Sequence, residues 1–72
     1  MDNHYFAIDV ETANADYSSI CQVGVAEFEN GTILRTWKTL VNPEQYFDQF
    51  FVNIHGIDQE TVKFLFRIFR IY

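Results

Sequence analysis

An Asn-Gly dipeptide between two apolar runs is the feature that most constrains the fold of this chain. Asn30 and Gly31 separate residues 20–28 from residues 33–41, and both runs are rich in β-branched and aromatic side chains. Both dipeptide residues tolerate the positive φ that two-residue turns require, so the pattern predicts a β-hairpin. The apolar faces of residues 20–28 suit a central strand, whereas the charges within the returning strand suit an edge.

The flanking segments add one strand before this hairpin and helix after it. Residues 4–11 combine apolar, β-branched and aromatic side chains and predict a first strand, and the polar residues 12–19 predict a loop. Aromatic side chains at helical spacing predict one or two turns within residues 44–57. Asp58 predicts the N-cap of a helix from about residue 59 to the mid-60s. The expected fold class is α/β, with a three-stranded antiparallel meander followed by helix.

Length and composition limit the chain to one small protein domain, residues 1–72. Hydrophobic residues make up 49% of the sequence, which excludes a disordered chain. No apolar run approaches the roughly 18 residues of a membrane span, and the first residues lack the features of a secretory signal. We therefore expect a cytoplasmic protein that has no membrane partner. A single cysteine, Cys21, lies in an apolar run and predicts a buried, unreactive thiol.

The charge distribution restricts the kinds of partner. The formal net charge is −5, and all ten acidic residues lie in residues 1–62, where Arg35 and Lys38 are the only basic residues. An acidic surface repels phosphate, which disfavours a simple electrostatic nucleic-acid binder. Bound divalent cations reverse the local sign of an acidic site, so phosphate binding through metal ions stays open.

Two acidic residues stand two apart near the end of the predicted first strand. Because side chains alternate along a strand, Asp9 and Glu11 should share one face, with Ala7 leaving room beside them. Carboxylates held side by side repel each other unless a cation lies between them, and oxygen ligands suit Mg²⁺ or Mn²⁺. The plainer interpretation is a solvated strand end. The apolar run before the pair and the turn after it favour a site at the strand's carboxyl end.

The sequence around this pair resembles the first motif of the DEDD family of 3'-5' exonucleases, in the branch that includes the proofreading subunit of bacterial DNA polymerase III. Residues 6–14, Phe-Ala-Ile-Asp-Val-Glu-Thr-Ala-Asn, are similar to the family's apolar strand that ends in Asp-x-Glu-Thr. Residues 20–28, 39–43 and 54–57 resemble its second strand, the end of its third strand, and its Ile-His-Gly-Ile element. The four elements occur in the family's order within residues 6–62. Asn14 stands where the family often has Gly, which affects the local turn.

This resemblance implies a partial RNase H-like fold and cleavage of nucleotides from a 3' end with two Mg²⁺ or Mn²⁺ ions. The catalytic and metal-binding residues would be Asp9 and Glu11. The terminal nucleotide of a single-stranded DNA or RNA would lie against four residues, Thr12, Ala13, Ile54 and His55. For His55 the alternative is a structural histidine with a satisfied hydrogen bond. The resemblance also suggests DNA polymerase subunits as partners and favours His over Tyr as the general base.

The resemblance does not extend to residues 63–72, which hold no acid and no histidine. The family's remaining acids and its general base lie later in its chains. We therefore expect a divergent tail on an N-terminal fragment that is inactive alone. The family's fourth strand, which pairs with its first, would also be missing, so the first strand should expose an edge that favours self-association.

Other residues have plainer interpretations. We expect His4 to be incidental and Glu27 to be a strand residue without chemistry. Trp37, Phe50 and Phe51 are better explained by packing than by base stacking. Two other functions remain open for the whole chain. One is a non-catalytic RNase H-like module for interaction or nucleic-acid binding, and the other is an unrelated small β-α interaction domain.

Overall fold

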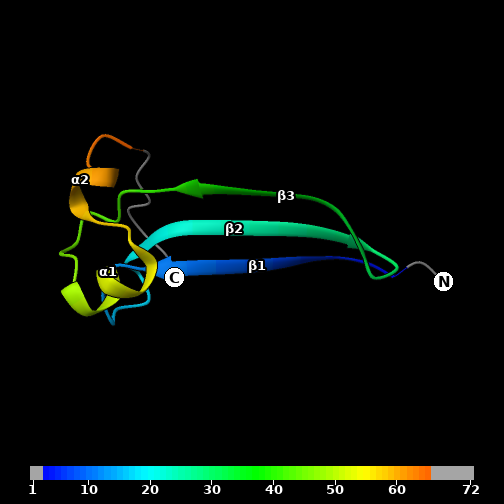
Figure 1. Ribbon diagram of the computed structural model, residues 1–72, viewed down its shortest axis with the longest axis horizontal. Coiled ribbons are helices and arrows are strands. Elements are labelled where there is room, and N and C mark those ends of the chain that lie inside the picture. Colours follow the sequence, from blue (N-terminus) through cyan, green and yellow to red (C-terminus); the bar gives the residue numbers. More distant parts are fainter. Residues whose placement is uncertain (1–2, 66–72) are drawn as a thin grey trace.

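Three strands form one antiparallel sheet in the computed structural model, which describes residues 3–65. The strands are β1 (His4–Thr12), β2 (Ile20–Glu29) and β3 (Thr32–Leu40), in the spatial order β1-β2-β3 (Figure 1). The predicted central position of the second strand is therefore confirmed. β1 and β3 form the two edges of the described sheet.

The β2–β3 turn has the backbone that Asn-Gly predicts. Asn30 has φ 51° and Gly31 has φ 80°, so both residues lie in the left-handed region. The β2–β3 register shifts once, between Glu27 and Phe28. From there to Leu40 each residue of β3 faces its partner on β2 at a constant offset, which fixes the side chains that share a face.

The first helix, α1 (Gln49–His55), begins later than the aromatic spacing suggests. Asp48 caps it, because its carboxylate accepts a hydrogen bond from the Phe50 N–H at 3.0 Å. Gly56 ends it with φ 77°, and its N–H donates to the Val52 carbonyl at 2.8 Å. Tyr46 and Phe47 share the spacing of the later aromatic residues but precede the cap.

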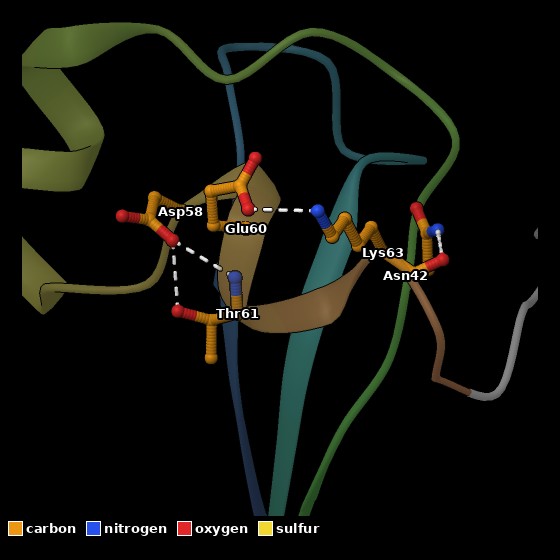
Figure 2. A network of polar contacts seen from close by, with 5 residues as sticks. All are labelled: Asn42, Asp58, Glu60, Thr61 and Lys63. Carbon is orange, nitrogen blue, oxygen red and sulfur yellow. Dashed lines mark hydrogen bonds and ion pairs between the residues drawn. The ribbon is translucent and has the colours of Figure 1, made fainter.

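The second helix, α2 (Gln59–Val62), has the predicted N-cap but only four residues. The Asp58 carboxylate accepts from the Thr61 N–H at 2.9 Å and from its hydroxyl at 2.8 Å (Figure 2). The Asn42 amide donates to the Lys63 carbonyl at 3.3 Å, which joins the end of α2 to the segment that follows β3. None of the helices within residues 3–65 is long and apolar enough to cross a membrane.

A small core lies at one end of the sheet, where the helices are. Buried Cys21, Ile57 and Val62 pack together, with Leu40 and Phe47 against them. The prediction of a buried thiol is confirmed, because Cys21 is fully buried. Figure 1 shows α1 and α2 beside this end of the sheet, so most of the sheet's length has no described helix over it.

The aromatic residues expected to pack do not all do so. Trp37 is 48% exposed and Phe50 is 66% exposed, whereas Phe51 is partly buried. Ile8, in the middle of β1, is 70% exposed. The packing prediction was wrong for Trp37 and Phe50 within the described residues. Trp37 lies on β3, where no described helix covers the sheet, and Phe50 lies on α1, which has no buried residue.

Candidate active site at the end of the first strand

Asp9 and Glu11 lie on one face of β1. The β1–β2 register is regular through both residues, with Asp9 opposite Gly24 and Glu11 opposite Gln22. Because alternate residues of a strand point to the same side, the two carboxylates project from the same face. Asp9 is exposed and Glu11 is partly buried. Neither carboxylate is sealed within apolar packing, so both are accessible to solvent.

An open depression of about 370 Å³ lies beside Asp9 on this sheet. Its lining includes small residues of β1 and β2, namely Ala7, Gly24 and Ala26. A Cβ atom built at Gly24 would meet its nearest neighbours, the Asp9 carbonyl oxygen and the Lys38 Cβ, at 3.8 Å. These are ordinary contacts, so the depression comes from the lack of a side chain at Gly24 rather than from a close approach of two backbones.

The strand pairing changes register directly after Glu11. Glu11 pairs with Gln22 but Thr12 pairs with Ile20, so Cys21 is the extra residue on β2. Irregularities of this kind bend a strand and redirect side chains, and they recur beside active sites. Burial raises the pKa of the Cys21 thiol to about 11, with a smaller contribution from the negative charge of Glu11. The thiol is therefore protonated at neutral pH and is a poor nucleophile.

His55 holds the residue that follows the carboxylate pair. Its Nδ1 accepts a hydrogen bond from the Ile57 N–H at 3.0 Å, so the ring proton lies on Nε2. Nε2 then donates to the Thr12 carbonyl at 2.8 Å, across 43 residues of sequence. Both ring nitrogens are thus engaged within the protein. This is the structural alternative considered for His55, and it fixes the end of β1 against the end of α1.

The backbone of Ala13 is held in a similar way. Its N–H donates to the Ser19 carbonyl and its carbonyl accepts from the Asp48 N–H, both at 2.8 Å. Ala13 is fully buried, whereas the Thr12 side chain is partly exposed. Of the residues expected to contact a nucleotide, Thr12, Ala13 and His55 come together here. Ile54, on the same helix turn as His55, is 66% exposed.

Asn14 organises the loop after β1, a role that sequence reasoning did not assign to it. Its side-chain amide donates to the Tyr46 carbonyl at 2.9 Å and to Gln45 at 3.3 Å, while its Oδ1 accepts from the Asp16 N–H at 2.8 Å. The residue is 2% exposed and does not adopt a positive φ. The turn therefore does not need glycine, and the amide ties it to the segment before α1.

A charged cluster far from Asp9 along β1 was also missed. Buried Glu27, on β2, accepts a hydrogen bond from His4 Nε2 at 2.7 Å and another from the Arg35 guanidinium. Because His4 lies on β1 and Arg35 on β3, the two hydrogen bonds connect all three strands. These hydrogen bonds, first that of His4 and then that of Arg35, hold the pKa of Glu27 below its ordinary value. This hydrogen bond gives His4 a structural role, which could not be predicted because the pairing spans 23 residues and leaves no local pattern.

The carboxylate pair offers two oxygen donors on one face of β1. Within residues 3–65 no group of three or more His, Cys, Asp or Glu side chains is placed to hold a metal ion. Two oxygen donors on one exposed face nevertheless fit a hard divalent cation that keeps several waters. The chain forms a three-stranded meander whose first strand carries two carboxylates near its end, and short helices follow the meander. This arrangement is consistent with the beginning of an RNase H-like nuclease domain.

Comparison with known proteins establishes the family. The sequence profile described as "Exonuclease" matches residues 6–64, and the chain belongs to this exonuclease family, which confirms the resemblance to the DEDD exonucleases. The chain is also 28% identical over 65 residues to the DNA polymerase III PolC-type of Caldanaerobacter subterraneus subsp. tengcongensis. That match covers 88% of this chain but 5% of the polymerase, so the chain spans a small part of that relative.

Proposed function

We propose that this chain supplies the first two carboxylate ligands of a metal-dependent 3'-5' exonuclease site. The observation that carries the proposal is the placement of Asp9 and Glu11 on one accessible face of β1, inside the segment that matches the exonuclease family. Mg²⁺ or Mn²⁺ bound there supplies positive charge for a scissile phosphate and lowers the pKa of a bound water. The family match supports nuclease chemistry, and the polarity and the two-ion mechanism are the finer proposal.

The chain's own residues divide the work. Asp9 and Glu11 bind the cation, and the exposed depression beside Asp9 leaves room for a nucleotide. His55 and Asn14 act as positioning residues, because their hydrogen bonds fix the backbone on which Thr12 and Ala13 lie. The Thr12 side chain and exposed Ile54 are the groups in this region left to contact the terminal nucleotide.

Two carboxylates are too few for two ions. Two-metal phosphodiester cleavage holds its ions about 3.5–4 Å apart with several shared ligands. Residues 63–72 contribute no Asp, Glu or His to the sequence. We therefore expect the remaining ligands and the general base to come from residues outside this sequence, and we expect little nuclease activity from the 72-residue chain alone.

DNA is the proposed substrate, and a DNA polymerase is the proposed partner. The support is the relative, which is itself a DNA polymerase III. Single-stranded RNA is the alternative substrate. A test on matched single-stranded DNA and RNA oligonucleotides decides between them.

The first experiment reads the gene beyond codon 72 in all three frames. Segments that supply further aspartates and a histidine would define a longer chain to express. With Mg²⁺ and a 5'-labelled single-stranded oligonucleotide, that longer chain should give a ladder of products shortened from the 3' end. The 72-residue chain should leave the same oligonucleotide intact.

Two substitutions in the longer chain distinguish an exonuclease from a non-catalytic module. Asp9→Asn and Glu11→Gln should each lower the cleavage rate by about 10²–10³-fold, because each weakens the binding of the cation whose positive charge would stabilise the transition state. A non-catalytic module would retain its oligonucleotide binding and show no cleavage in any variant. Endonucleolytic products, or release of nucleotides from the 5' end, would contradict the proposed polarity.

A further inference from the structure

Lys38 is the basic side chain that lines the depression beside Asp9, within the part of the chain that the structure describes. It lies opposite Gly24 on β3, and Gly24 lies opposite Asp9 on β1. The Cβ position of Gly24 would be 3.8 Å from the Lys38 Cβ, so the lysine projects from the face that carries Asp9. Gly24 places no side chain between the two.

The charge of Lys38 is not engaged by an acid. Within residues 3–65, the other basic side chains on this acidic protein form ion pairs, Arg35 with Glu27 and Lys63 with Glu60. Lys38 is exposed and forms no such pair, even though Asp9 lies on the same face. Adjacent strands are about 4.8 Å apart, so the Asp9 and Lys38 backbones are separated by about 10 Å. That separation leaves space for a ligand between them.

We propose that Lys38 contacts the phosphate backbone of the nucleic-acid strand that occupies this depression. The inference rests on the proposed function, because it takes one phosphate to be held at Asp9 and places a neighbouring phosphate of the same strand at Lys38. A lysine ammonium is a compact point charge on a flexible stem, which suits a phosphate contact without base specificity. The lysine also offsets repulsion between the acidic chain and the strand.

The test uses the full 72-residue chain and a fluorescent single-stranded oligothymidylate in MgCl₂. Fluorescence anisotropy gives the binding constant over a series of NaCl concentrations. For single strands, each phosphate contact contributes about −0.7 to the slope of log Kobs against log salt concentration. Lys38→Ala should make the slope shallower by about 0.7, and Lys38→Arg should restore it because the charge is retained.

The matched control is Lys63→Ala, which removes the same charge from a residue outside the depression. It should leave the wild-type slope unchanged. Equal slopes for wild type and Lys38→Ala, equal losses in the two alanine variants, or no salt-dependent binding by the wild type would each overturn the inference. A separate measurement distinguishes failure of the proposed function. If the proposed function is wrong, the Asp9→Asn, Glu11→Gln double variant should bind Mn²⁺ as well as the wild type does.

Discussion

Asp9 and Glu11 share a face but not an environment. Asp9 borders the open depression, whereas Glu11 is partly buried at the register shift and acts electrostatically on Cys21. A cation held by both would meet solvent on the Asp9 side and protein on the Glu11 side. The residues around the pair, rather than the pair itself, decide how rigidly it is presented.

Asn14 is the residue whose loss should loosen this end of β1 most directly. Asn14→Ala removes a buried amide that bonds Tyr46 and Gln45, and it leaves the Tyr46 carbonyl and the Asp16 N–H without this partner. Such a loss costs about 1–3 kcal/mol, so the free energy of unfolding measured in urea should fall by that amount. Asn53→Ala, on the exposed surface of α1, is the control and should change it by less than about 0.5 kcal/mol. Equal effects of the two substitutions would contradict the assigned role.

Cys21 reports on the charge of Glu11. Because burial and the Glu11 carboxylate raise its pKa to about 11, the folded protein should react slowly with a thiol reagent at pH 8 and faster as the pH approaches 11. The raised pKa stabilises the fold below the ordinary thiol value of 9.0, and this contribution is lost as the pH rises toward 11. Glu11→Gln should shift the rise in reactivity to lower pH. A rate as fast as that of the urea-unfolded chain would refute the burial.

At the scale of elements, local signals predicted the three strands, the β2–β3 turn and the α2 cap, but not the contacts between β1 and the helices. Asn30-Gly31 and Asp58 each act within a few residues, so the hairpin and the α2 cap could be read from sequence. The start of α1 could not, because aromatic spacing continues across Asp48. Contacts such as His55 to Thr12 join residues 43 apart and leave no periodic trace. The shared face of Asp9 and Glu11 could be predicted, whereas the hydrogen bond from His55 that holds the next residue, Thr12, could not.

The Glu27 cluster should make the sheet acid-sensitive. The pKa of Glu27 is held below its ordinary 4.5 by His4 and then Arg35, so its contribution to stability is present above pH 4.5 and is lost as the pH falls through the lowered pKa. The urea midpoint of the wild type should therefore fall between pH 6 and pH 3 by more than that of Glu27→Gln. Glu29→Gln, an exposed neighbour, should behave like the wild type. If the urea midpoints of the wild type and of Glu27→Gln change equally with pH, the cluster does not cause the acid sensitivity.

At the scale of the whole molecule, the chain exposes more surface than its size requires. Its accessible surface is 5395 Å², whereas a compact monomer of 8.5 kDa exposes about 4,700 Å². The excess agrees with the described arrangement, in which the helices lie at one end of the sheet and both edge strands are open (Figure 1). Open strand edges with exposed apolar side chains favour pairing with another chain.

Self-association through β1 is the expected consequence. Ile8 is 70% exposed in the middle of this edge strand, and a charge placed there should discourage pairing. Sedimentation velocity should show oligomers of the wild type that dissociate in Ile8→Lys. Ile54→Lys adds the same charge at a 66% exposed isoleucine on α1 and should leave the oligomers intact. A monodisperse wild-type monomer would contradict the prediction.

The proposed function requires that Asp9 and Glu11 together bind a divalent cation. Mn²⁺ titration of the isotope-labelled 72-residue chain is the direct test of this binding. Paramagnetic broadening of amide signals in nuclear magnetic resonance spectra locates the bound ion. The broadening should centre on residues 9–12 and their neighbours 22–24 on β2, and it should vanish in the Asp9→Asn, Glu11→Gln double variant. Broadening centred elsewhere, or broadening that persists in the double variant, would contradict the account.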